Sequence, residues 1–227
     1  MSTPRDARMA GGLLLVMAAC AIFAELGVRA ALVIPGDAAA TAARIAASPG
    51  LFRLGFVGYL VAFLCDIPIA VLFYAMLRRV DATGALTAMA FRLVYAAVVG
   101  AALIAYAGAI HLATNPKLVL LCMELFDQGF HLALVFFGVH LVLLGGLLVR
   151  SEMLPRGLGG LVSLGGVAYL LDNVSFFVAP AFRASAAPFL AALAMSELVL
   201  AAWLVVKGVS RPVQDAPRSC YDTSHVT

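Results

Sequence analysis

Six long apolar stretches constrain this chain more than any other feature of its sequence. They cover residues 9–34, 51–77, 85–112, 118–149, 158–178 and 187–206, and each is bounded by Pro, Gly or charged residues. A membrane core about 30 Å thick is crossed by about 20 apolar residues in helical form. We therefore predict an all-α, polytopic membrane protein, built as a bundle of six transmembrane helices.

The composition supports this fold class and excludes several functions. The 227 residues are 64% hydrophobic and only 12% charged, and the mean hydropathy is +1.05. A soluble domain of this size needs more polar side chains to cover its surface. Globular enzymes, disordered chains and nucleic-acid binders are thereby excluded, and the lipid bilayer is the partner that the composition implies.

Positive charges predict the orientation. With two of the 15 Lys and Arg residues inside spans, nine fall on the side of the termini and four on the opposite side. This bias places both termini in the cytoplasm of a multi-pass inner-membrane protein. The first apolar stretch follows Arg5 and Arg8 as in a signal peptide, but its length favours a retained span. We expect residues 1–208 to form one membrane domain and residues 209–227 a disordered cytoplasmic tail.

The segment between the first two spans has helix signals of its own. Asp37 is a good start signal, Ser48, Pro49 and Gly50 form a stop, and the residues between them are rich in alanine. We expect a short external helix here. It serves as a connector or as a lid over a cavity, with Ile45 as its one large apolar anchor.

Ionisable residues inside the spans are the main functional signal. An aspartate near the bilayer centre costs at least about 2.5 kcal/mol, so such residues persist mainly where they face the bundle interior and find partners. Several helices contribute them near the midplane and in the outer half of the membrane. The predicted polar intramembrane site consists of Glu25, Arg29, Asp66, Arg92, His131, His140, Asp172 and Glu197.

Spacing suggests some partners. Glu25 and Arg29 are four residues apart on one helix and should form an ion pair. We expect Arg92 to extend to the cytoplasmic headgroups in preference to pairing with Asp66. Glu197 should face inward and be protonated unless another helix supplies a partner.

Asp172 has polar neighbours of its own. Asn173 and Ser175 can satisfy its carboxylate locally, so the three residues form a self-contained polar patch. Pro68 is the one proline well inside a central span that could mark a broken helix.

The fourth stretch is too long for one straight span, so its first turns should lie at the interface or break near Gly129. Glu124, Asp127 and His131 form one stripe on it, whereas His140 points to the opposite side. A metal site on this stripe and a haem ligated by His131 therefore remain alternatives to a hydrogen-bonded polar face. The identity of any metal or cofactor stays open, because Glu-x-x-Asp-x-x-x-His is not an established ligand motif.

Five sequence segments carry a family resemblance. They are AELGVRAALVIPGDAAATAARIAASPGLFRLGF, LCDIPIAVLFYAMLRRV, AFRLV, LVFFGVHLVLLGGLLVRSEMLPRGLGG and YLLDNVSFF. With these segments the chain resembles the uncharacterised bacterial integral-membrane family known as domain of unknown function 4386. The resemblance implies a helical bundle, places Glu25, Arg29, Asp66, Arg92, His140 and Asp172 in motif positions, and implies no activity.

Three functions remain open. The leading hypothesis is a polar site built by Glu25, Asp66, His140 and Asp172 that binds or translocates a small solute or a proton. The first alternative is an intramembrane enzyme, with or without a metal, that acts on a lipid or other apolar substrate; no GxSxG or HExxH motif supports it. The second is an accessory or sensory membrane protein whose polar residues serve packing alone.

Overall fold

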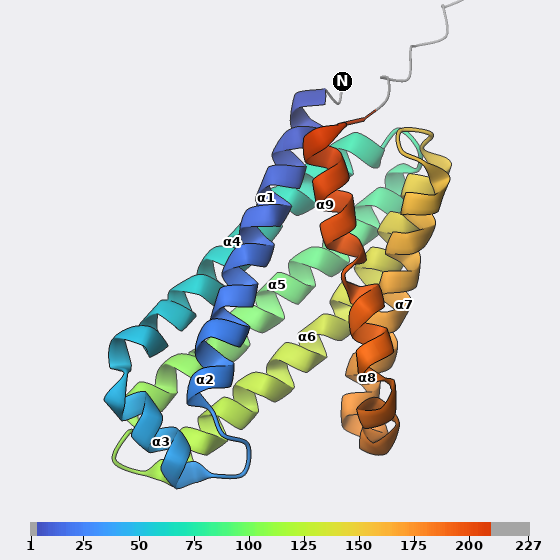
Figure 1. Ribbon diagram of the computed structural model, residues 1–227. Helices are drawn as coiled ribbons and strands as arrows, with labels where there is room; N and C mark the ends of the chain where they lie inside the picture. The colour runs from blue at the N-terminus through green and yellow to red at the C-terminus, as the bar shows by residue number, and fades with distance from the viewer. Residues whose placement is uncertain (1–3, 210–227) are drawn as a thin grey trace, which may run out of the picture.

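The computed structural model describes residues 4–209, and the regular structure in this range is helical throughout (Figure 1). The predicted tail at 209–227 lies, apart from Val209, outside the described residues. The elements are α1 (Pro4–Ile22), the π-helix η1 (Phe23–Arg29), α2 (Ala30–Leu32), α3 (Ala38–Ala47), α4 (Pro49–Leu77), α5 (Ala82–His111), α6 (Pro116–Arg150), α7 (Arg156–Val178), α8 (Pro180–Ala194) and α9 (Ser196–Val206).

The long helices form a closed ring. α4, α5, α6 and α7 pack against one another in chain order, and α9 packs on α1, which in turn packs on α4. α9 also touches α7, which completes the ring. The start of α1 and the end of α9 lie together at one end of the bundle, here named the terminal end, whereas α3 lies at the other, the α3 end (Figure 1).

Six segments of the described chain are long and apolar enough to cross a membrane, as predicted. Their outward faces carry large apolar side chains that a water-soluble fold would bury. Ile104 and Val206, for example, are 74% and 73% exposed. This outward surface is the one expected to contact lipid.

Helix boundaries follow from local capping chemistry. The carboxylates of Asp37 and Asp81 accept hydrogen bonds from the backbone N–H groups of Ala40 and Gly84, and Asn115 caps α6 in the same way. Pro49, Pro116 and Pro180 occupy first positions of their helices, where a missing N–H costs nothing. The helix expected after Asp37 is therefore confirmed as α3, and Thr41 and Ile45 lie on its buried face.

Two departures from regular helix were not predicted from the sequence. The first span changes to a π-helix over η1, and the last is divided at Met195 into α8 and α9. The expected breaks are not seen: α4 continues through Pro68 and α6 continues through Gly129. Gly129 instead permits close packing, because a Cβ there would lie 2.6 Å from the Cβ of Ala102 on α5.

Glycines set the contact between α6 and α7. A Cβ at Gly145 would lie 2.5 Å from the backbone oxygen of Gly159, and one at Gly159 would lie 2.9 Å from the oxygen of Gly145. Close approach of this kind is how small residues hold membrane helices together. Gly146 faces away, and a Cβ there would meet nothing within 4 Å.

This contrast gives a matched test of the fold. Gly145→Ala should destabilise the protein by about 1–3 kcal/mol, because the two backbones must separate to admit the methyl group. Gly146→Ala should be neutral or stabilising by up to about 1 kcal/mol, since alanine is the better helix former. Unfolding with sodium dodecyl sulfate in mixed micelles measures both free energies. Equal effects of the two substitutions would contradict the observed packing.

Candidate functional site

Arg92 lies at the centre of the bundle with no exposed surface, and all five of its N–H groups have partners. Nε and Nη2 contact Oδ1 of Asp66 at 2.8 and 2.6 Å. Nη1 lies 2.9 Å from Oε1 of Glu197 and 3.2 Å from Nε2 of His140. Nη2 also lies 3.3 Å from the sulfur of Met17. We name Asp66, Arg92, His140 and Glu197 the Arg92 cluster.

The hydrogen bonds of His140 assign its tautomer. Its Nδ1 lies 2.8 Å from the backbone oxygen of Ala88, which can only accept. Nδ1 therefore carries the proton and donates it. Nε2 accepts from Arg92, so the imidazole in this cluster is neutral.

The charges of the Arg92 cluster do not balance. One guanidinium faces two carboxylates, those of Asp66 and Glu197, and the imidazole adds no charge. Within the described residues, Oδ2 of Asp66 is fully buried and has no hydrogen-bond partner. A buried charge without compensation is costly in a medium of low dielectric constant. The cluster therefore has the chemistry of a site for one positive charge.

Five helices position this cluster. α4, α5 and α6 supply Asp66, Arg92 and His140 from the middle of long, continuous helices, and α1 supplies Met17. Glu197 lies in the first turn of α9, immediately after the break at Met195. A helix start favours a carboxylate because its free N–H groups carry partial positive charge.

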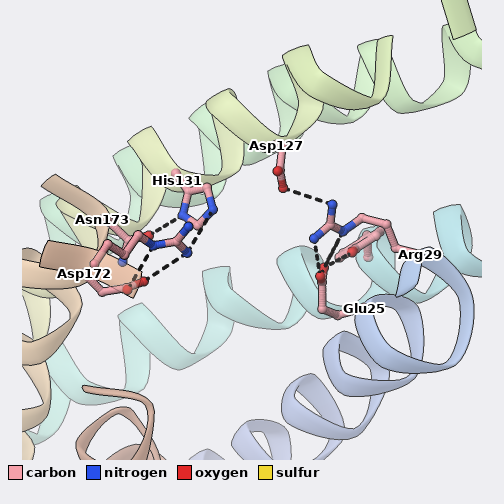
Figure 2. Close-up of polar contacts among 8 residues, drawn as sticks. Glu25, Arg29, Asp127, His131, Asp172 and Asn173 are labelled. Atoms are coloured by element: carbon pink, nitrogen blue, oxygen red, sulfur yellow. Dashed lines mark hydrogen bonds and ion pairs between the residues drawn. The ribbon is translucent and has the colours of Figure 1, made fainter. Parts of the chain in front are cut away.

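A second cluster forms around Arg29 (Figure 2), at the end of η1, which α2 connects toward α3. Its Nε donates to Oε1 of Glu25 at 2.8 Å, and its Nη1 lies 3.0 Å from Oδ1 of Asp127 on α6. Tyr59 on α4 donates its hydroxyl proton to the other oxygen of Glu25. The Arg29 cluster thus contains Glu25, Arg29, Tyr59 and Asp127. The predicted pair of Glu25 and Arg29 is present in it.

A third cluster joins α6, α7 and α8 around Arg183, and Figure 2 labels its members His131, Asp172 and Asn173. Nε of Arg183 donates to Oδ1 of Asp172 at 3.0 Å, and its Nη2 lies 3.4 Å from Nε2 of His131. Nδ1 of His131 is 2.6 Å from Oδ1 of Asn173, whose Nδ2 donates to the backbone oxygen of Tyr169. The Arg183 cluster is therefore His131, Asp172, Asn173 and Arg183.

The eight predicted site residues thus divide among three clusters. Asp66, Arg92, His140 and Glu197 meet in one, Glu25 and Arg29 belong to the second, and His131 and Asp172 belong to the third. A single pocket shared by Glu25, Asp66, His140 and Asp172 is not what the structure shows. His131 and His140 lie in different clusters, in line with their predicted opposite directions.

Two predicted partnerships were wrong. Arg92 does not extend to the headgroups but is buried against Asp66, because two carboxylates and an imidazole neutralise and bond its guanidinium. The carboxylate of Asp172 is held by Arg183 and not by its neighbours. Ser175 donates to the backbone oxygen of Asp172 instead.

Sequence reasoning missed Arg183 and Tyr59. Arg183 was counted among the four cations on the side opposite the termini, although Asp172 lacked a cation within its own span and Arg183 follows eleven residues later. Tyr59 carried a clearer signal, because it lies seven residues before Asp66, on the same helix face.

Two cavities adjoin the Arg92 cluster. The larger, of about 210 Å³, lies toward the α3 end and includes Glu197 and Met17 in its lining. Ile22 and Met195, each about half exposed, also line it, so it opens sideways between α1 and the junction of α8 and α9. The smaller, of about 10 Å³, lies toward the terminal end beside His140. Its volume is close to that needed for one water molecule.

The donor sets do not favour a metal. Among residues 4–209, no three His, Cys, Asp or Glu side chains gather as metal ligands. The stripe on α6 is divided, since Glu124 is exposed, Asp127 binds Arg29 and His131 binds Asn173. Each polar cluster is organised around an arginine guanidinium in place of a metal ion.

Charge counting predicts the order of stabilities in the Arg92 cluster. Arg92→Met leaves two buried carboxylates without a cation and should lower the free energy of unfolding by about 3–5 kcal/mol. Asp66→Asn leaves one guanidinium and one carboxylate and should cost less, about 1–3 kcal/mol. Arg150→Met removes an exposed ion pair with Asp81 and should cost about 1 kcal/mol or less. Detergent unfolding in mixed micelles gives all three values, and equal losses for Arg92→Met and Arg150→Met would refute the description.

Comparisons with known proteins place the chain in a family. An uncharacterized protein of Archaeoglobus fulgidus is 32% identical over 152 residues, which cover 67% of this chain and 82% of that relative. No solved structure matches the chain. The model of the domain of unknown function family DUF4386 matches residues 9–208, a range that contains all three clusters. The chain is a multi-pass, all-helical membrane protein and belongs to the DUF4386 family.

Proposed function

We propose that this protein binds a proton at the Arg92 cluster and carries it across the cell's inner membrane, with both termini in the cytoplasm. The observation that carries the proposal is the charge imbalance of the buried cluster, in which Oδ2 of Asp66 has no partner among the described residues. One proton on the carboxylates of Asp66 and Glu197 makes the cluster neutral. Buried acids in membrane spans are characteristic of proton relays.

The surroundings of the cluster support exchange of this proton. The 210 Å³ cavity reaches Glu197 from the α3 end, and the void beside His140 approaches from the terminal end. Arg92 connects the two sides through a continuous set of hydrogen bonds. The proton site therefore lies between two approaches, one lined by Glu197 and the other by His140, an arrangement that alternating access can use.

The break at Met195 supports movement at the site. Discontinuous helices place binding groups at the midplane of many transporters. Here the break places Glu197 at the start of α9, and it is the only carboxylate of the cluster that lines a described cavity. A change in the angle between α8 and α9 alters the position of Glu197 relative to Arg92.

Proton flux in reconstituted vesicles tests the proposal. Vesicles with a potassium gradient and valinomycin should acidify or alkalinise in the direction of the imposed potential when they contain the wild-type protein. Asp66→Asn should reduce this flux at least about tenfold, because the variant cluster is neutral without a proton. A lumenal pH-sensitive dye reports the flux.

Glu124→Gln is the matched control, since it also removes one carboxylate but from the exposed face of α6. It should retain wild-type flux. Gel filtration and thermal unfolding verify that each variant is folded. Folded Asp66→Asn protein with undiminished flux would overturn the proposal.

A further inference from the structure

We infer that the 210 Å³ cavity beside Glu197 binds a small lipophilic organic monocation, which competes with the proton for the one uncompensated negative charge. This inference rests on the proposed proton site and adds its substrate class. The argument begins with the lining of the cavity. Its polar members include Glu197, Tyr95 and Tyr169, whereas most of the wall is apolar.

The cavity offers aromatic rings around a carboxylate. Phe63, Tyr95, Phe130, Phe137 and Tyr169 all line it together with Glu197. The ring of Phe137 lies 4.8 Å from that of Tyr95 and 5.2 Å from that of Tyr169, measured between centroids. Aromatic faces beside a carboxylate are the chemistry that recognises ammonium groups carrying apolar substituents.

The guanidinium of Arg92 lies behind the cavity wall, with its central carbon 5.3 Å from the centroid of the Phe137 ring and its Nη1 bonded to Oε1 of Glu197. Arg92 is not part of the cavity wall, has no exposed surface and is held on its far side by Asp66. The cavity therefore presents the carboxylate of Glu197 and not the cation behind it. Because the cluster carries one excess negative charge, either a monocation or a proton neutralises it. Binding of both would leave a buried excess positive charge, so the two compete.

Two hydroxyls in the wall have unused hydrogen-bonding capacity. The side-chain oxygens of Tyr95 and Tyr169 form no hydrogen bond with any residue in the described part of the chain, although both residues line the cavity. Polar atoms at a mainly apolar cavity are the usual means of orienting a small ligand.

The position of the opening is consistent with an apolar ligand. Ile22 and Met195 at the rim are exposed on the lipid-facing surface, between α1 and the junction of α8 and α9. A ligand enters from the bilayer, where lipophilic cations accumulate, and meets Glu197 at the inner end. The volume of the cavity restricts it to a small molecule with one ring or a short branched chain.

Benzyltrimethylammonium is a suitable probe, because its charge is independent of pH and its uncharged isostere, neopentylbenzene, has nearly the same shape. Isothermal titration calorimetry of purified protein should show benzyltrimethylammonium binding that strengthens by up to about tenfold per unit rise in pH, since the proton is a competitor. Titrations in buffers of different ionisation enthalpy should show release of up to one proton per bound cation. Neopentylbenzene should bind at least about tenfold more weakly.

Three variants separate the contribution of the Glu197 charge to binding from that of the cavity volume. Glu197→Gln should weaken benzyltrimethylammonium binding at least about tenfold, whereas Glu124→Gln on the exposed face of α6 should bind as the wild type does. Ala18→Leu should also block binding, because the larger side chain fills part of the cavity and leaves the charge of the cavity unchanged.

The possible failures are distinguishable. Proton flux that depends on Asp66 without measurable benzyltrimethylammonium binding would overturn the cation site and leave the proton site standing. Cation binding that needs Glu197 but neither changes with pH nor releases a proton would support the cation site and contradict the proton site. Equal binding of probe and isostere would mean that the cavity accepts apolar molecules without regard to charge, and would overturn the inference.

Discussion

The attraction between one buried guanidinium and two buried carboxylates determines how this bundle is assembled. Arg92 cannot lie in the interior of a membrane protein without partners. From its position on α5, its N–H groups contact side chains on α1, α4, α6 and α9. In lipid, apolar packing alone supplies little preference for one neighbour over another. The polar centre therefore specifies which helices meet and at what depth, and the glycine contacts between α6 and α7 fix the remaining side of the ring.

Each arginine cluster is associated with a departure from regular helix. The π-helix η1 contains both Glu25 and Arg29, and the non-helical residue Ala179 between α7 and α8 allows Arg183 to lie beside Asp172. The break at Met195 places Glu197 in the first turn of α9. Such local changes in backbone geometry occur often at functional sites, because they direct side chains that a regular helix would point elsewhere. Their association with all three clusters suggests that polar pairing and helix irregularity arise from the same requirement.

Much of the fold was predictable because lipid imposes simple rules. The lengths of the apolar stretches gave the six spans, and the signals at Asp37 and Ser48 gave α3. All eight predicted site residues bind one of the three central arginines or are one of them, and Arg29 and Glu25 paired as their spacing indicated. The spacing of residues along the sequence could not predict which side chains pair between different helices. The partnership of Arg92 with Glu197 joins residues 105 positions apart, and that of Asp172 with Arg183 depends on a reversal at Ala179 that has no glycine to mark it.

The most direct test of the central claim is the protonation state of the resting cluster. Infrared spectroscopy of the purified protein in lipid distinguishes a protonated carboxylic acid from a carboxylate by its carbonyl stretching band. The account predicts a carboxylic-acid band at neutral pH that is present in wild-type and Glu124→Gln protein and is lost in Asp66→Asn, where one carboxylate balances Arg92. A wild-type protein without such a band, or one whose band survives Asp66→Asn unchanged, would contradict it.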